Sequence, residues 1–260
     1  LVLTASLLGH RAIAITDHDT TSALEEAKEA GRELGVTVLS GVEISVDHHG
    51  RTVHLLGYCF DSGVERLRAG LNTLLEGRNA RNRCIIEKLN ELGIPITYED
   101  VVKEAGGKVV GRPHFAAAMV KLGAVSSTQE AFDQYLATGG RAYVDRLQFS
   151  LKDAVAMVRE AGGVAALAHP KLVRLGPNED LDSLVRSLAE AGMAALECYY
   201  STHTPEETET YVRMAEKYGL VATGGSDYHG ANKPDLTLGW GRGDLRVPMS
   251  CAERLIELTS

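Results

Sequence analysis

Short apolar runs alternate with amphipathic stretches along most of the chain, and several of these runs end in histidine or a carboxylate. The first run, Ala12–Ile15, lies shortly after a glycine and opens at once into Asp17, His18 and Asp19. This pattern predicts a strand buried on both faces of a parallel sheet. The same pattern recurs in three later runs, which end at Glu43, at His169, and at Asp227 and His229.

The segments between these runs predict helices and one hairpin. An amphipathic stretch at 20–35 predicts a helix. The runs at 36–46 and 51–58 predict two strands joined by a short turn, in which we interpret His48 and His49 as solvated residues. After residue 150 the alternation continues, with expected helices at 151–161, 181–191, 205–218 and 252–258 and expected strands at 164–170, 193–200 and 220–229.

A block of helical patterns without strands interrupts the alternation. Residues 64–92 carry apolar side chains at helical spacing and several arginines, and shorter helices are expected at 96–107, 111–123 and 128–136. We interpret this block as an inserted cap beside a barrel mouth. The expected organisation is a first barrel part at 1–65, a helical insertion at 66–147 and a second barrel part at 148–260.

Composition narrows the classes of protein. A chain of 260 residues with 44% hydrophobic content can bury a full core, and one α/β barrel fits that length. The net charge of −8 leaves no broad basic surface for duplex nucleic acid, although bound metals would reverse the field locally for a nucleotide or a strand end. No apolar run is long enough to span a bilayer, so no membrane partner is expected. Four scattered cysteines without a CxxC motif predict a reducing compartment, which we take to be the cytoplasm.

Six side chains at or near the expected strand ends are candidate metal ligands. Imidazoles and carboxylates without a thiolate suit Mn²⁺, Fe²⁺ or Zn²⁺ in a multi-metal hydrolytic centre. A structural role is the alternative for each, since a single histidine at a strand end often serves only as a hydrogen-bonding residue. The candidates are His18, Glu43, His54, His169, Asp227 and His229.

The order of the motifs TDHDT, GVEIS, HLLGY, AHP and GGSDYH resembles the polymerase and histidinol phosphatase (PHP) superfamily. GRPHFA in the helical block and YYSTHTPEE after the AHP strand resemble the branch that acts on nucleoside 3′,5′-bisphosphates and on RNA 5′ ends. The resemblance covers nearly the whole chain. It implies the α/β class, with a distorted (β/α)7 barrel, and a centre of two to three divalent ions. Mn²⁺ is the first expectation, with Fe²⁺ and Zn²⁺ as alternatives, and the implied ligands are the six candidates above.

One departure from this family concerns the N-terminus. The family opens with a strand that bears His-x-His and a nearby acidic residue, and neither motif precedes Ala12. Residues 1–9 match the helix that follows that strand, so the first barrel strand is missing from the expected fold. We expect this chain to be a truncated form of an active enzyme, because every later ligand type is present. A degenerate relative is the alternative.

Within the first motif and the last, three residues are the expected catalytic groups: His18, Asp17 and His229. Asp17 and its neighbour Asp19 are suited to orienting His18 or a metal-bound water from the second layer of the site.

Arg112 and His114 are the expected substrate-binding residues. A guanidinium fork suits a phosphate, and the helix start at Pro113 offers amide donors beside it. Lys171 and Tyr143 are further expected phosphate contacts. A surface role for Arg112 is the alternative.

These observations predict a metal-dependent phosphoesterase that hydrolyses phosphate monoesters. The expected substrates are small phosphorylated molecules, above all the 3′-phosphate of nucleoside 3′,5′-bisphosphates, and RNA 5′ ends. A histidinol-phosphatase-like enzyme and a non-catalytic metal- or nucleotide-binding module are the alternatives. The oligomeric state is left open.

Overall fold

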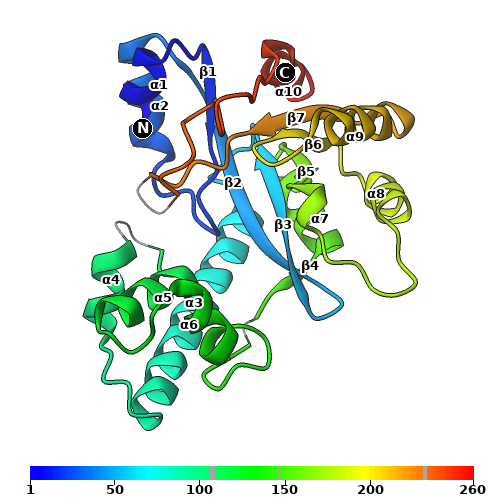
Figure 1. The fold of residues 1–260 in the computed structure, drawn as a ribbon. Helices are drawn as coiled ribbons and strands as arrows, with labels where there is room; N and C mark the ends of the chain where they lie inside the picture. The colour runs from blue at the N-terminus through cyan, green and yellow to red at the C-terminus, as the bar shows by residue number, and fades with distance from the viewer. Residues whose placement is uncertain (106–108, 146, 231–232) are drawn as a thin grey trace. The chain divides into compact units, whose positions relative to one another are not determined.

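The computed structural model describes residues 1–105, 109–145, 147–230 and 233–260, which form two compact units (Figure 1). The first, which we call the sheet unit, comprises Leu1–Leu71 and Phe149–Ser260. The second, the helical unit, comprises Asn72–Gln148. The chain thus leaves the sheet unit once and returns to it.

A curled seven-stranded sheet forms the centre of the sheet unit, in the order β1-β2-β3-β5-β6-β7 with β4 beside β2. The pairs β1–β2, β2–β4, β5–β6 and β6–β7 are parallel, whereas β3 runs antiparallel to both β2 and β5. The mixed α/β class predicted from the sequence is confirmed. The strands are β1 (Ala12–Ile15), β2 (Thr37–His48), β3 (Arg51–Tyr58), β4 (Phe149–Ser150), β5 (Val164–Leu167), β6 (Ala195–Tyr200) and β7 (Val221–Gly225).

Helices cover this sheet as the amphipathic stretches predict. In the sheet unit α2 packs on β2, α7 on β3 and β5, α9 on β6, and α10 on β7. The apolar stripe of each helix is thereby buried against a strand. The helices are α1 (Val2–Leu7), α2 (Leu24–Leu34), α7 (Leu151–Glu160), α8 (Leu181–Glu190), α9 (Pro205–Lys217) and α10 (Met249–Glu257).

The prediction that Ala12–Ile15 is buried on both faces is wrong. Only Ile15 of β1 is buried, and the other three residues are half-buried. The reason is that β1 lies at one end of the strand order and pairs, among the described residues, with β2 alone. The fully buried pattern occurs instead in β2, where Val42, Ile44 and Val46 have no exposed surface.

The helical unit has a core of its own, which includes Ile85, Leu89, Phe115 and Met119, all with no exposed surface. At 128–136 the expected single helix begins as an α-helix and continues as a π-helical turn, Phe132–Leu136. Residues 106 and 107, at the end of another expected helix, lie outside the described residues. The helices are α3 (Glu65–Glu91), which begins in the sheet unit, α4 (Tyr98–Ala105), α5 (Arg112–Lys121) and α6 (Thr128–Ala131).

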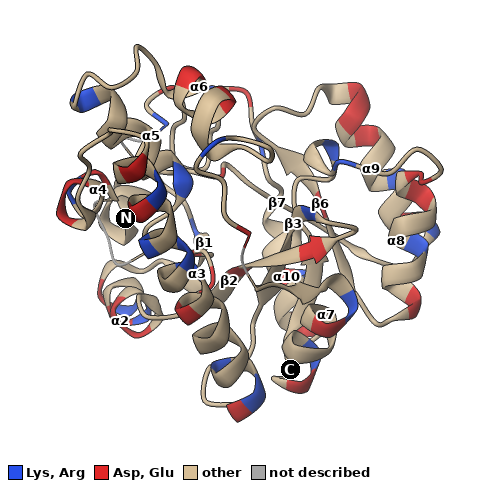
Figure 2. Ribbon diagram, turned by 90° about the horizontal axis from the view of Figure 1, so that it is seen from below, with Lys and Arg blue, Asp and Glu red and all other residues tan. Residues whose placement is uncertain are grey.

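Charged side chains of both signs are interspersed along the helices. Figure 2 shows both basic and acidic residues along α2, α3 and α9. Among the described residues, no helix has both the length and the apolar character needed to cross a membrane.

Replacing Leu55 by alanine tests the core of the sheet. Leu55 has no exposed surface and pairs with Ile44 on β2 and Leu167 on β5. We expect Leu55→Ala to lower the free energy of unfolding by about 2–5 kcal/mol, because it leaves a cavity among buried side chains. Urea denaturation measures this. The control, Leu258→Ala, removes a side chain that is 50% exposed and should change stability by less than about 0.5 kcal/mol.

Candidate metal centre

A short backbone ladder places His18 beside Glu43. Beyond the end of β1, the amide of Asp19 donates to the carbonyl of Glu43 (2.9 Å) and the amide of Glu43 donates to the carbonyl of Asp17 (3.1 Å). The buried carboxylate of Asp19 accepts a hydrogen bond from the amide of Ser45 (2.7 Å). The chain after β1 is therefore held parallel to β2, with His18 bridged to Glu43.

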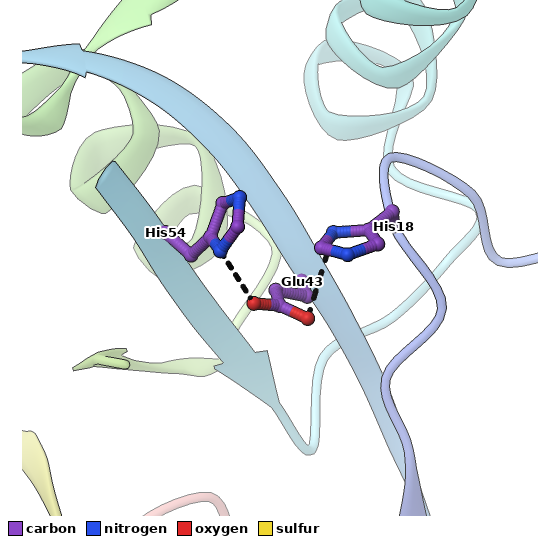
Figure 3. A group of neighbouring side chains, drawn as sticks. All are labelled: His18, Glu43 and His54. Carbon is purple, nitrogen blue, oxygen red and sulfur yellow. Dashed lines mark ion pairs between the residues drawn. The ribbon is translucent and has the colours of Figure 1, made fainter. Parts of the chain in front are cut away.

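Glu43 lies at the centre of a group of imidazole rings. Its Oε1 is 2.8 Å from Nδ1 of His54 and 3.2 Å from Nε2 of His169, and its Oε2 is 3.5 Å from Nδ1 of His18. Figure 3 shows the carboxylate between His18 and His54. The antiparallel register of β2 and β3 pairs Ser45 with His54, so Glu43 is a diagonal neighbour of that ring on the same face.

His169 lies two residues beyond the end of β5, in a backbone conformation with φ 27°. Its amide donates to Oε2 of Glu197 (2.6 Å), a buried residue on β6. Burial raises the pKa of Glu197 to about 8. Glu197, which is not among the site residues predicted from the sequence, holds the backbone of His169 in this uncommon conformation.

Asp227 and His229 follow β7. Oδ2 of Asp227 accepts hydrogen bonds from the hydroxyl of Tyr200 (2.9 Å) and the ammonium of Lys233 (2.6 Å). Nδ1 of His229 is 2.7 Å from the carbonyl of Asp227 and donates to it. The ring of His229 lies 6.2 Å from that of His18, measured between centroids. Neither Tyr200 nor Lys233 is among the site residues predicted from the sequence.

All six candidate ligands line one cavity of about 250 Å³ in the sheet unit. The predicted convergence of side chains far apart in sequence is therefore present, while their role as ligands stays a prediction. The cavity is completed by Tyr200 and Lys233 and by two short segments, Thr52–Val53 and Leu172–Val173.

The electrostatics of this group favour a bound cation. Burial alone would raise the pKa of Glu43, but the rings of His54 and His18 and the hydrogen bonds from His169 and His54 hold it well below its usual range. Burial acts to lower the pKa of His169, yet Glu43, Glu197 and Asp227 raise it overall. A buried ionised carboxylate is stabilised by neighbouring positive charge and by hydrogen-bond donors.

The donor atoms also fit a metal ion. Ligand atoms of His18, Glu43 and His54 all lie within 4.8 Å of one another. Nδ1 of His169 is buried and has no hydrogen-bond partner among the described residues, so a lone pair or a proton on this ring is left unsatisfied. Imidazole nitrogens and carboxylate oxygens are ligands for divalent transition metals.

Asp17 and Lys171, which are predicted site residues in the sheet unit, do not line this cavity. Asp17 is exposed, although its charge is close enough to interact with that of His229. Lys171 donates to Oε2 of Glu207 (2.7 Å) and to the carbonyl of Thr202 (2.9 Å), at the start of α9.

The other predicted substrate residues lie in the helical unit. Arg112 begins α5, donates to the carbonyl of Leu136 (3.2 Å) and places its guanidinium 5.7 Å from the ring centre of Tyr143. Nδ1 of His114 accepts a hydrogen bond from the amide of Gly111 (3.0 Å) and so caps the same helix. Arg112 and Tyr143 are thus in contact with each other, while His114 turns back onto its own helix.

Comparison with known proteins identifies the family. The model of the PHP domain matches residues 1–222. A 3′,5′-nucleoside bisphosphate phosphatase of Chromobacterium violaceum is 34% identical over 218 residues, which are 84% of this chain and 76% of that protein. A 5′-3′ exoribonuclease of Haemophilus influenzae is 32% identical over 235 residues, 88% of this chain and 85% of that protein.

A solved structure from Bifidobacterium adolescentis, assigned as a metal-dependent phosphoesterase, has a TM-score of 0.84 and 31% identity to this chain. The match covers 100% of this chain and 90% of the chain in that structure. The chain belongs to the PHP domain family, as its motifs predict. Together with the donor set described above, this relationship supports divalent metal ions as cofactors.

Substitutions at Glu197 test how His169 is held. We expect Glu197→Ala to lower the free energy of unfolding by about 1–3 kcal/mol, because the buried amide of His169 loses its acceptor. Glu197→Gln keeps an acceptor oxygen and should cost less than the alanine variant. Urea denaturation in the presence of a chelator measures both without a contribution from bound metal. Equal stability of the two variants would show that this hydrogen bond does not hold the loop.

Proposed function

We propose that the protein is a metal-dependent phosphomonoesterase that releases the 3′-phosphate of nucleoside 3′,5′-bisphosphates and also acts on RNA 5′ ends. The observation that carries this proposal is the convergence of four imidazoles and two carboxylates on one cavity. The names of the two relatives, a bisphosphate phosphatase and an exoribonuclease, support the substrate class.

The proposed cofactor is Mn²⁺, two to three ions per site, with Fe²⁺ and Zn²⁺ as alternatives. The proposed ligands are His18, Glu43, His54, His169, Asp227 and His229, whose mixture of nitrogen and oxygen donors suits these ions. When bound, such ions supply Lewis-acid polarisation of a phosphoryl oxygen and neutralise the charge that develops during hydrolysis.

The residues of the chain then have distinct tasks. Because Nδ1 of His229 donates to the carbonyl of Asp227, the neutral ring presents Nε2 as an acceptor, suited to hold a metal or a proton. His18 is proposed as the second catalytic group, with Asp17 close enough to His229 to influence its charge. Lys233 adds a positive charge to the cavity wall, which favours an anionic substrate.

The second phosphate of the substrate is proposed to bind the helical insertion, residues 66–147, acting as a cap. Arg112 supports this role, since it combines a planar guanidinium with the N-terminus of a ten-residue helix. Tyr143, in contact with Arg112, and His114 are proposed to complete this phosphate site. Lys171 is proposed as a further phosphate contact, although it is engaged by Glu207 in the free protein.

The proposed location is the cytoplasm. All four cysteines lie in the described part of the chain and are free thiols, which suits a reducing compartment.

Phosphate release from two substrates tests the activity. With Mn²⁺, we expect kcat/KM for adenosine 3′,5′-bisphosphate to exceed that for histidinol phosphate by at least about tenfold, because only the former carries a second phosphate for the cap. Glu43→Gln should lower kcat by about 100-fold or more, since it removes the central carboxylate. The control, Glu33→Gln on the exposed face of α2, should leave both constants unchanged.

Three outcomes would contradict this assignment. A preference for histidinol phosphate would favour a histidinol-phosphatase-like enzyme. No release from either substrate, with metal bound, would favour a non-catalytic binding module. Full activity of Glu43→Gln would show that the reaction does not take place in this cavity.

Arg112→Ala tests the phosphate site of the cap. We expect KM for adenosine 3′,5′-bisphosphate to rise by about tenfold or more, with a smaller change in kcat, because the guanidinium binds a phosphate that does not react. For a substrate with a single phosphate the effect on KM should be absent. Arg112→Lys should recover only part of the loss, since an ammonium lacks the planar fork.

Arg83→Ala, an exposed arginine of α3, is the matched control and should behave as the parent. An equal loss for substrates with one and with two phosphates would refute the assigned role of Arg112.

A further inference from the structure

A second group of metal-ligand side chains lies at the tip of the β2–β3 hairpin, away from the centre described above. Nε2 of His49 is 2.9 Å and Nε2 of His48 is 3.3 Å from Oε1 of Glu179. Glu179 belongs to the loop that precedes α8. The three residues line a cavity of about 570 Å³ that shares no lining residue with the first cavity.

We propose that His48, His49 and Glu179 form a second metal site, which binds one divalent ion of the zinc type. Two imidazoles and one carboxylate, with a water as the fourth ligand, are a common ligand set for tetrahedral zinc.

The separations of the donor atoms agree with such a site. Ligand atoms about 2.0–2.1 Å from a zinc ion, at tetrahedral angles, lie about 3.3 Å from one another. Each histidine nitrogen lies within 3.3 Å of the glutamate oxygen, and all three ligand atoms lie within 4.8 Å of one another. Small side-chain rotations therefore suffice to surround an ion.

The backbone brings two adjacent histidines to the same side. Neighbouring residues of a strand point to opposite faces. The rings of His48 and His49 nevertheless lie 4.5 Å apart, because His49 occupies the turn with φ 52°. The prediction that both are solvated is wrong for His48, whose side chain is 13% exposed, whereas that of His49 is 69% exposed.

One buried nitrogen in this group is only weakly satisfied. Nε2 of His48 is buried and, among the described residues, has no hydrogen bond of regular geometry, although it pairs with the carboxylate of Glu179 at 3.3 Å. A cation between these atoms would satisfy it. Oε2 of Glu179 accepts a hydrogen bond from the amide of Gly176 (2.7 Å), which fixes the carboxylate with Oε1 toward the rings.

The surroundings suit a cation that keeps a water molecule. Asp47 and Asp180 line the same cavity and make its field more negative, with Lys152 the opposing charge among the lining residues. The half-exposed position of Glu179 and the exposed ring of His49 leave a path for the ion to enter.

An ion here would join two segments of the chain that also line the first cavity. The hairpin leads directly into Thr52 and Val53, and the loop that carries Glu179 begins at Leu172 and Val173; all four residues line the candidate catalytic cavity. Joining the hairpin tip to this loop would restrict both walls of that cavity. The proposed ion would connect these two segments, and its binding does not depend on the substrate of the enzyme.

Zinc content of the full chain tests this proposal. Parent, Glu179→Gln, His49→Gln and the matched control Glu190→Gln, an exposed glutamate of α8, are equilibrated at the same buffered free Zn²⁺ and analysed by mass spectrometry of the metal. We expect Glu179→Gln and His49→Gln each to hold one zinc ion fewer per chain than the parent and the control. Adding Zn²⁺ should raise the melting temperature of these two variants by less than it raises that of the parent and the control.

A second background separates this site from the catalytic centre. In Glu43→Gln, which weakens the first centre, adding Glu179→Gln should still lower the zinc content by one ion per chain. Equal zinc content in the parent and in Glu179→Gln, with equal thermal response, would overturn the proposal and leave only an ion pair at the hairpin. Replacing His49, which is exposed, removes no buried side chain. The His49→Gln variant therefore tests the second metal site even if Glu43→Gln does not fold.

Discussion

The carboxylate of Glu43 is buried in the sheet unit, and such a group requires positive charge beside it. This requirement explains why the rings of His18, His54 and His169 surround it, two of them on its Oε1 and the third on its Oε2. Divalent ions held by the same rings would supply that charge at neutral pH, when free imidazoles are largely uncharged. The same interaction would therefore both stabilise this part of the sheet and hold the proposed ions.

The centre also depends on backbone conformations that residues with side chains rarely adopt. Asp19, His169 and Asp227 all have positive φ, between 27° and 55°. Each is held by a specific contact: Asp19 by the amide of Ser45, His169 through Glu197, and Asp227 by Tyr200 and Lys233. Residues in such conformations cluster at functional sites, where the surrounding structure compensates for the strain. In this protein the compensating contacts come from a neighbouring strand or from the loop beyond, at the points where the chain leaves strands β1, β5 and β7.

The sequence predicts the ligand candidates better than the residues that hold them. His18, His169 and Asp227 follow apolar runs, and the ends of neighbouring strands meet at one edge of a sheet, so their convergence is foreseeable. The prediction that a strand ends at Glu43 is wrong, because Glu43 lies within β2, which continues to His48. Glu197 and Tyr200 lie within a strand, and nothing in LECYY reveals that β5 and the loop after β7 lie beside it. His48 was expected in solvent because the loop that covers it is more than one hundred residues further along the chain. The half-burial of β1 is likewise a property of its place in the strand order.

Crystals of the chain grown with Mn²⁺, with anomalous diffraction recorded on both sides of the manganese absorption edge, test the central claim most directly. The account predicts anomalous peaks inside the cavity of about 250 Å³, with at least one within about 2.5 Å of a carboxylate oxygen of Glu43 and a ring nitrogen of His18 or His54. Manganese bound elsewhere on the surface, with Glu43 contacting only protonated histidines, would contradict it.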